Sequence, residues 1–208
     1  MDLLVTAGRT LGFSLAAGVN LYATVAMLGL ATRYGLVTLP PQFAVFDNPW
    51  IIAGALALYV VEFVADKVPW IDTMWDTAHT LVRPLGGALI AVSTLGDASP
   101  WAQALVAVTG GTIAAGGHLT KAGTRAAVNV SPEPFTNWAL SLAGDVFVLG
   151  LGALALSYPL LALAVTLICL VAIVLLLRWL IGWVRRAAAP PVDREGAVAM
   201  TRPSGMAE

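Results

Sequence analysis

The sequence has 208 residues, of which 59% are hydrophobic and 11% are charged, and its formal net charge is −1. A soluble domain carries roughly a quarter charged residues, so this composition excludes an ordinary water-soluble globule of this size. The net charge also excludes a global basic field of the kind that attracts nucleic acid, and we expect no nucleic-acid partner.

The apolar residues occur in long blocks, and these blocks predict an all-α integral membrane protein with about six transmembrane helices. A run of about 18 apolar residues is long enough to cross the hydrocarbon core of a bilayer as a helix. In chain order, we expect the spans near residues 11–30, 49–65, 85–95, 101–129, 136–156 and 159–184.

The segments between and after the spans complete the predicted organisation. An amphipathic polar helix is expected between spans two and three, over residues 66–83, and ends at Arg83-Pro84. Pro132 and Pro134 predict a turn before the fifth span, because proline lacks the backbone donor that a helix needs. We therefore expect a helical membrane domain at residues 1–187 and a disordered cytoplasmic tail at residues 188–208.

The distribution of lysine and arginine predicts the orientation. The six spans place ten of the eleven basic residues at or near one side, with Arg33 as the exception. An excess of basic residues marks the cytoplasmic side. We expect a multi-pass protein of the cytoplasmic membrane, with both termini inside and the first span retained, since no basic region typical of a cleaved signal peptide precedes it.

Six spans also divide into three plus three, which would invert the second half relative to the first. The second and fifth spans both open near proline, asparagine and tryptophan, and each carries an acid, Glu62 or Asp145. Inverted repeats with a site at their interface are typical of secondary transporters. Chance similarity between two membrane-entry turns explains these short matches about equally well.

Polar residues inside the predicted spans are the first candidates for a site. An ionised side chain at the centre of a membrane helix costs about 2.5–3.5 kcal/mol on insertion scales, so such residues are expected to face the bundle interior or a wet cavity. Carboxylate oxygens also suit a hard divalent cation, so Glu62 and Asp66 are candidate ligands for one, and we expect no other cofactor. The predicted ligand- or ion-binding residues are Asn20, Tyr22, Glu62, Asp66 and Asp145.

Two polar stripes lie next to these residues, one at positions 72, 76, 79 and 83 and the other at 118, 121, 125 and 129. Their spacing of three or four places each stripe on one face of a helix. We expect the neighbouring acids to pair with Lys121 and Arg125 in a network on the cytoplasmic side; the alternative is a set of charges that reach the membrane interface, with only a packing role. The network residues are Lys67, Asp72, Asp76, His79, Arg83, His118, Lys121, Arg125, Asn129 and Glu133.

Glycine and tryptophan fit the same arrangement. Gly110, Gly111, Gly116 and Gly117 favour close packing of the fourth span against its neighbours, rather than a bend within it. All seven tryptophans lie near predicted span ends, and we interpret them as anchors at the membrane interface.

Several motifs occur together in the order that is typical of one bacterial family. They are Gly18-Val19-Asn20-Leu21-Tyr22-Ala23, the segment 62–69, the two polar stripes and Ser131-Pro132-Glu133-Pro134-Phe135. Over residues 10–185 the chain resembles domain of unknown function 4126, a family of small bacterial membrane proteins. The resemblance implies a polytopic helical fold in the bacterial inner membrane, and it implies no function. Where the family has an acidic pair before the fifth hydrophobic stretch, this chain has Gly144-Asp145, which leaves one carboxylate there.

The leading hypothesis is a small secondary transporter or permease of the cytoplasmic membrane. Glu62 and Asp145 would take up a proton or cation as the site changes sides. Lys121 and Arg125 would serve as counter-charges or as contacts for an anion, together with His118. The expected partners are the lipid bilayer and a small solute, ion or lipid head group, and the small size of the chain leaves room for a homodimer.

Two other classes of function remain open. In an enzyme of lipid or phosphoester metabolism, Asp72, Asp76 and His79 would bind a metal or act as a base, while the arginines and Lys121 would hold a phosphate. No G-x-S-x-G, H-E-x-x-H or Walker motif supports a particular reaction. A non-catalytic scaffold or accessory subunit predicts a stable protein partner and no response to ligands.

Overall fold

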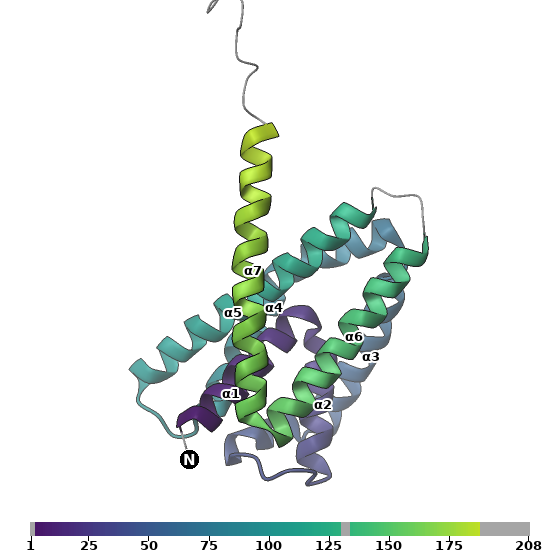
Figure 1. Ribbon diagram of the computed structural model, residues 1–208. Helices are drawn as coiled ribbons and strands as arrows, with labels where there is room; N and C mark the ends of the chain where they lie inside the picture. The colour runs from purple at the N-terminus through teal and green to yellow at the C-terminus, as the bar shows by residue number, and fades with distance from the viewer. Residues whose placement is uncertain (1–2, 130–133, 188–208) are drawn as a thin grey trace, which may run out of the picture. The chain divides into compact units, whose positions relative to one another are not determined.

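The computed structural model describes residues 3–129 and 134–187, and over these residues the chain is all-helical, without strands (Figure 1). This confirms the all-α part of the predicted fold class. The chain divides into two compact units, residues 1–173 and 174–208, and the site described below lies in the first. The elements are α1 (Leu3–Val19), α2 (Leu21–Arg33), the 3-10 helix η1 (Pro41–Phe46), α3 (Pro49–Ala65), α4 (Pro69–Leu95), α5 (Pro100–Asn129), α6 (Pro134–Ser157) and α7 (Pro159–Ala187).

Proline is the first residue of each helix from α3 to α7. Proline suits this position because its fixed φ matches the helix and its missing N–H would have no partner there. At α3, the Asn48 side chain also accepts a hydrogen bond from the Trp50 N–H at 2.9 Å and caps the helix. These signals explain why the predicted second span has the bounds of α3. The predicted turn at residues 131–133 and the predicted tail lie outside the described residues.

Residues 66–95 differ from the prediction. The amphipathic helix and the third span were expected to be separated at Pro84. Instead, α4 is one helix of 27 residues with Pro84 in its interior. Pro84 removes one backbone hydrogen bond, whereas packing against α5 acts along the whole helix. A methyl group added to Gly87 would collide with Ala114 of α5, so the two backbones are unusually close. The close packing predicted from the glycines of the fourth span is confirmed.

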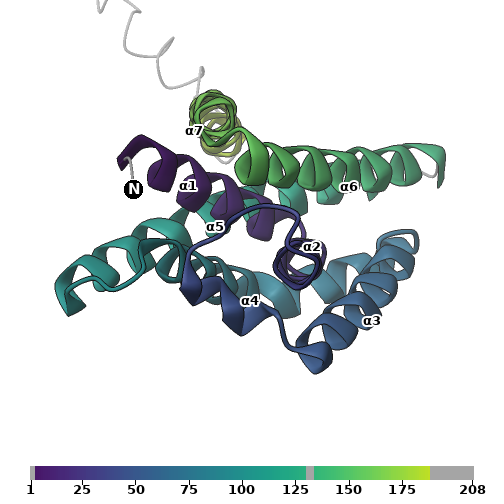
Figure 2. The ribbon, with the colours of Figure 1, turned by 90° about the horizontal axis from the view of Figure 1, so that it is seen from below.

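The predicted first span, residues 11–30, is not one continuous helix. The backbone leaves the helical conformation at Asn20 (φ −147°, ψ 100°), and α2 turns away from the direction of α1: Figure 2 shows α2 end-on and α1 along its length. The two distal ends lie on the same side of the fold, because Thr10 of α1 bonds Thr94 at the end of α4, and Gly29 of α2 packs on Ile52 at the start of α3. Residues 3–33 therefore form a helical hairpin with Asn20 at its tip, called the α1–α2 hairpin below (Figure 1).

This hairpin changes the predicted count and symmetry of the spans. A three-plus-three repeat would match the hairpin with α5, but α5 is one continuous helix of 30 residues. Within the described residues, the two halves therefore begin with different architectures. Two described segments are both long and apolar enough to cross a membrane, Phe135–Ser157 in α6 and Pro159–Trp179 in α7.

The α1–α2 hairpin lies at the centre of the first unit. Its α1 packs against α4, α5 and α6, while α2 lies between α3 and α6, where Figure 2 shows it end-on. The core side chains are small near the tip: a methyl group on Gly18 would collide with the carbonyl group of Ala114 in α5. The hairpin tip is thus fixed against the middle of the neighbouring helices.

Candidate functional site

Asn20 joins the two helices of the hairpin and reaches the neighbouring α6. It is 2% exposed, and its Oδ1 accepts a hydrogen bond from the Ala23 N–H at 2.9 Å, which caps α2. Its Nδ2 donates to Oδ1 of Asp145 at 3.3 Å. Asparagine suits the break because it provides both an acceptor for the cap and a donor for the carboxylate.

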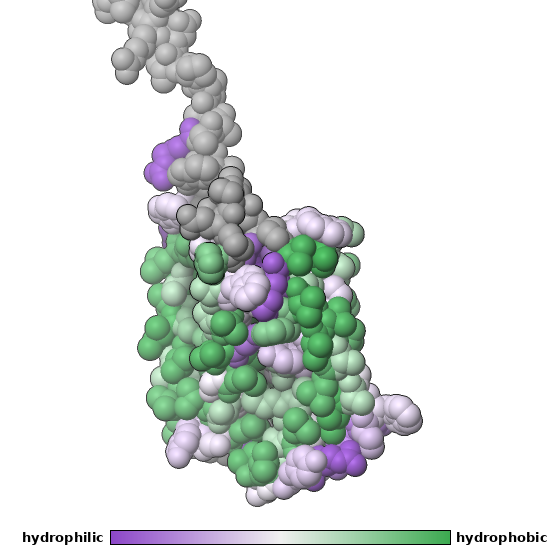
Figure 3. Space-filling view, turned by 90° about the vertical axis from the view of Figure 1, so that its right-hand side faces the viewer, coloured by the Kyte–Doolittle hydropathy of each residue, from purple (hydrophilic) through white to green (hydrophobic). Residues whose placement is uncertain are grey.

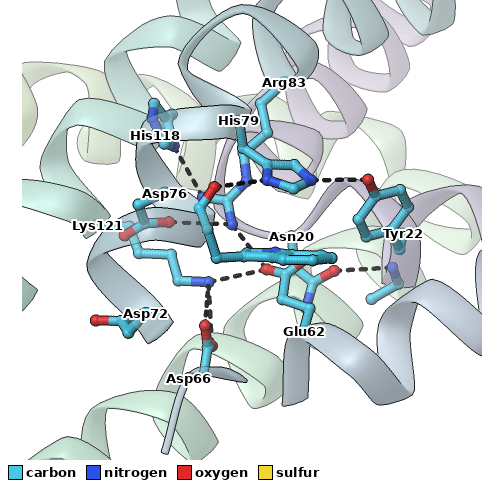
Figure 4. Close-up of polar contacts among 12 residues, drawn as sticks. Asn20, Tyr22, Glu62, Asp66, Asp72, Asp76, His79, Arg83, His118 and Lys121 are labelled. Atoms are coloured by element: carbon cyan, nitrogen blue, oxygen red, sulfur yellow. Dashed lines mark hydrogen bonds and ion pairs between the residues drawn. The ribbon is translucent and has the colours of Figure 1, made fainter. Parts of the chain in front are cut away.

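Arg83 of α4 is the centre of a buried polar network (Figure 4). Its Nη2 lies 2.8 Å from a carboxylate oxygen of Glu62 and 3.4 Å from one of Asp76. Its Nη1 donates to Nδ1 of His118 at 2.9 Å and to the carbonyl oxygen of Gly18 at 3.5 Å. A positive charge at the carboxyl end of α1 also complements the helix dipole. Arg83 thus joins the hairpin tip to α3, α4 and α5.

Two cations of α5 continue this network. Lys121 Nζ lies 2.9 Å from Glu62 and 3.1 Å from Asp66. Arg125 lies 3.0 Å from Asp66 and 2.9 Å from Asp72, and it also donates to the backbone carbonyl of Asp66 at 2.7 Å. We call this set the ion-pair cluster: Glu62, Asp66, Asp72, Asp76, Arg83, Lys121 and Arg125.

The ion-pair cluster bears out most of the predicted pairing and corrects one part of it. Lys121 and Arg125 pair with three of the expected acids, but the partner of Asp76 is Arg83. The alternative of interfacial charges does not fit, because the cluster side chains are at most 11% exposed. The side chain of Asn129 and all of Glu133 lie outside the described residues.

Lys67 lies near the ion-pair cluster without joining it. Its Nζ donates to the Phe63 carbonyl at 2.8 Å and lies 3.0 Å from the centre of the Phe63 ring. Over the described residues, its ammonium forms no ion pair with a carboxylate. The predicted place of Lys67 in the network is therefore only at its edge.

His79 of α4 contacts the hairpin through Tyr22. Its Nδ1 is 2.7 Å from the Trp75 carbonyl, which can only accept, so this nitrogen carries a proton. In the neutral ring, Nε2 then accepts from the Tyr22 hydroxyl at 2.7 Å. The Trp75 ring stacks on His79 with centroids 4.5 Å apart, and its Nε1 is buried.

His118 has the opposite arrangement. Its Nδ1 faces Arg83, which can only donate, so this nitrogen has no proton and the ring is neutral. The proton is then on Nε2, 3.3 Å from the Thr80 hydroxyl. His118 thus serves as a neutral hydrogen-bonding group in this arrangement.

Asp145 of α6 has a different environment from the other acids. It is 8% exposed, and one oxygen accepts from Asn20, while Oδ2 is buried and accepts no hydrogen bond from the residues that the structure describes. The carboxylate forms no ion pair within the same residues. With the ion-pair cluster it makes five buried acids around three cations, and Lys67 at the edge still leaves one acid unmatched.

Two cavities lie near the contact between Asn20 and Asp145, and neither residue is part of either lining: Val19 and Gly144 line one cavity, and Ala23 and Leu149 line the other. One has a volume of about 320 Å³ and lies between α1, α5, α6 and the first half of α7, with Gly144 and Arg125 in its lining. The other has a volume of about 310 Å³, lies between α2, α3 and α6, and includes Tyr59 and Leu149. The hairpin tip and Asp145 therefore lie between the lining of a cavity near the cluster cations and that of a cavity toward the distal ends of the hairpin.

The two carboxylates expected to bind a divalent ion share an ammonium group instead. Lys121 Nζ contacts both Glu62 and Asp66. In the part of the chain that the structure describes, no three acidic, histidine or cysteine side chains are arranged to hold a metal ion.

Tyr59 is a site residue that the sequence analysis missed. It lines the cavity between α2, α3 and α6, on the same face of α3 as Glu62 three residues later. That spacing from an intramembrane acid was the available signal. The other predicted residues come together: Asn20 and Asp145 at the hairpin tip, Tyr22 on His79, and Glu62 and Asp66 in the ion-pair cluster.

Comparison with known proteins gives a family. No curated protein and no solved structure matches the chain. The model of a family described as Domain of unknown function (DUF4126) matches residues 7–179, which include every described residue of the ion-pair cluster and the hairpin tip. The chain therefore belongs to this family, DUF4126.

Proposed function

We propose that the chain is a multi-pass protein of the bacterial cytoplasmic membrane, in which α3–α7 cross the bilayer and the α1–α2 hairpin enters from one side and returns. Large exposed hydrophobic side chains occur along all five helices, and Figure 3 shows them covering most of the face that carries α3 and α6. Five tryptophans near helix ends are at least half exposed, as interfacial anchors are: Trp50, Trp70, Trp101, Trp138 and Trp179.

The hairpin changes the expected side of the membrane for the start of α1 and leaves the other expected sides unchanged. Lys67, Lys121 and Arg125 belong to the end of the fold where α3 leads into α4, and they favour this end as cytoplasmic. Because both distal ends of the hairpin lie at the opposite end of this unit, we expect the start of α1 on the outer side of the membrane. Five crossings with this hairpin replace the six crossings expected from hydropathy.

Within this arrangement, the protein acts as a small secondary transporter. The observation that supports this function best is the position of Asp145: a buried acid with unmatched charge, at a helix break, between two cavities. Broken helices whose ends face a polar site in the middle of the membrane are typical of secondary transporters. A carboxylate at this position can take up a proton or a cation from either cavity when the hairpin tip moves.

The contacts separate the roles of the two acids that were expected to couple transport. Glu62 accepts from both Arg83 and Lys121, so its charge is matched and its role is to hold α3, α4 and α5 together. Asp145 is the residue that binds the proton or cation. Lys121 and Arg125 act as counter-charges, since an anionic solute would have to displace their carboxylate partners.

The contacts favour the alternatives less. An enzyme that holds a phosphate on Arg83, Lys121 and Arg125 would need to break their ion pairs first. A base at His79 would need to lose its bond to Tyr22. No particular feature of the described residues supports a scaffold role.

Transport is tested with purified protein in liposomes on a solid-supported membrane, where a solute jump that moves charge gives a transient current. The solutes are alkylamines, amino acids, carboxylates, phosphate and inorganic cations, each with and without a pH gradient. We expect a current for at least one solute, its loss in Asp145→Asn, and wild-type current in Asp97→Asn, the same change at an exposed acid. A current that is unchanged in Asp145→Asn, or the absence of current for every solute, contradicts the proposal.

A further inference from the structure

The cavity between α2, α3 and α6, called the α2–α3–α6 cleft here, has a lining of one chemical kind. Its volume is about 310 Å³, and every lining residue except Tyr59 is alanine, leucine or methionine. Figure 2 shows α2 between α3 and α6, and it forms the floor of this cleft. Leu56 and Leu149 on the two walls are 41% and 50% exposed, so the cleft opens sideways on the face shown in Figure 3.

One end of the cleft lies about one helical turn from Asp145, which is not itself a lining residue. Leu149 follows Asp145 by one turn of α6, and Ala23 follows Asn20 by one turn of α2, so the Asn20–Asp145 contact lies just beyond the lining on both helices. Tyr59 is the one polar side chain in the lining of the cleft. The cleft thus combines an apolar length with a single acid near one end.

We propose that this cleft binds an amphiphilic organic cation, with an aliphatic chain along α2 and a protonated amine at Oδ2 of Asp145. This inference rests on the proposed function in taking Asp145 as the residue that binds cations, and it names the substrate class. An ammonium group supplies both the charge and the hydrogen bond that the buried Oδ2 does not receive from described residues. The Tyr59 ring adds a face on which a cation is favourable.

Amphiphiles of other charge fit less well. A neutral alcohol of equal length fills the apolar part but leaves the acid unmatched, and a carboxylate places a second negative charge beside it. Within a series of linear amines from propyl to hexyl, each methylene buried from water is expected to lower the Kd about fourfold. Chain length and head-group charge therefore test the two ends of the cleft separately.

The test is isothermal titration of full-length protein in nanodiscs with hexylammonium, hexanol and hexanoate, with empty nanodiscs as the blank. Asp145→Asn removes the charge at the proposed site, and Asp97→Asn, the same change at an exposed acid, is its control. Leu149→Trp is compared with Leu142→Trp, to fill the cleft while the carboxylate remains. Both leucines lie on α6 with exposures of 50% and 52%, but only Leu149 lines the cleft.

We expect hexylammonium to bind at least tenfold more tightly than hexanol or hexanoate. Asp145→Asn should weaken its binding at least tenfold and Leu149→Trp at least fivefold, with both controls within twofold of wild type. Asp145→Glu, which keeps the charge, should retain more binding than Asp145→Asn. Equal binding of hexanol, or amine binding that survives Asp145→Asn or Leu149→Trp, overturns the inference.

The outcomes also separate this inference from the proposed function. Amine binding with the expected variant pattern, but without current in liposomes, supports the cleft and contradicts transport. A solute-driven current that needs Asp145, without amine binding, supports transport and overturns the amine as substrate class.

Discussion

The ion-pair cluster and the hairpin tip are two buried acidic regions of one fold, and they differ in how charge is matched. In the cluster, Arg83, Lys121 and Arg125 each contact two carboxylates. At the tip, Asp145 receives one bond from a neutral amide. A matched buried charge is costly to disturb, because each removed partner leaves another ion without compensation. An unmatched charge can bind and release a ligand, so the difference distinguishes a group that holds helices together from one that is available for function.

The largest expected effect comes from the same chemical change made in both regions. Glu62→Gln weakens two charged contacts, those with Arg83 and Lys121, although each cation keeps one other carboxylate, and it should lower the free energy of unfolding by about 3–5 kcal/mol. Asp145→Asn keeps the shape of the side chain and removes a charge that no described cation matches, so unfolding should become no easier. Unfolding by denaturing detergent, followed by tryptophan fluorescence, measures both variants. Equal destabilisation by the two changes would remove the distinction between the regions.

A smaller effect is expected where the hairpin tip contacts the middle of α5. A methyl group at Gly18 would collide with the backbone of Ala114, so Gly18→Ala should lower the free energy of unfolding by about 1–3 kcal/mol. Gly54 of α3 has open space at the same position, and Gly54→Ala is the matched control. Alanine has the higher helix propensity, so this control should be neutral or slightly stabilising. If Gly18→Ala matched the control, the tip would not be held against α5.

The hydrogen bond between Tyr22 and His79 joins α2, which begins at the hairpin tip, to α4, which carries part of the ion-pair cluster. Its loss should have a modest effect on stability. Tyr22→Phe removes the hydroxyl 2.7 Å from Nε2 and should lower the free energy of unfolding by about 1 kcal/mol. Tyr158→Phe, at an exposed tyrosine between α6 and α7, is the control and should change it by less than about 0.5 kcal/mol. The same unfolding assay applies. A change in Tyr22→Phe no larger than that in the control would show that the bond adds nothing.

Much of the fold follows from local patterns in the sequence. The starts of α3–α7 carry proline, and α3, α5, α6 and α7 were predicted with small errors at the ends, whereas α4 was predicted as two segments. The hairpin was not predicted, because residues 11–30 are as apolar as a crossing helix and the reversal depends on packing of both distal ends against α3 and α4. Pro84 caused the opposite error, because it predicted a helix end where the helix continues. The contacts of α4 with α5 outweigh the one backbone hydrogen bond that proline removes.

The sequence predicted which residues belong to the candidate site better than it predicted how they pair. Helical spacing placed the two polar stripes on single faces and brought the right acids and bases together. It could not assign Asp76 to Arg83, since that pair depends on the register between helices. It also could not separate Glu62 from Asp145, because both are acids at similar depth in apolar helices, and the difference lies in the cations that three-dimensional packing places near each.

The smallest expected effect tests the comparison from outside both regions. Arg33 and Asp47 form an ion pair at 3.7 Å with side chains about two-fifths exposed, whereas Arg125 and Asp72 lie 2.9 Å apart with side chains at most 3% exposed. Solvent and salt screen the exposed pair, so a double-mutant cycle of Arg33→Gln and Asp47→Asn should give a coupling energy below about 1 kcal/mol that falls further in 1 M salt. The corresponding cycle of Arg125→Gln and Asp72→Asn should give a larger coupling that salt changes little, because water has less access to it. If the two couplings and their salt dependence were alike, burial would not be what makes the ion-pair cluster a structural element, and the contrast with Asp145 would have to rest on its cavities alone.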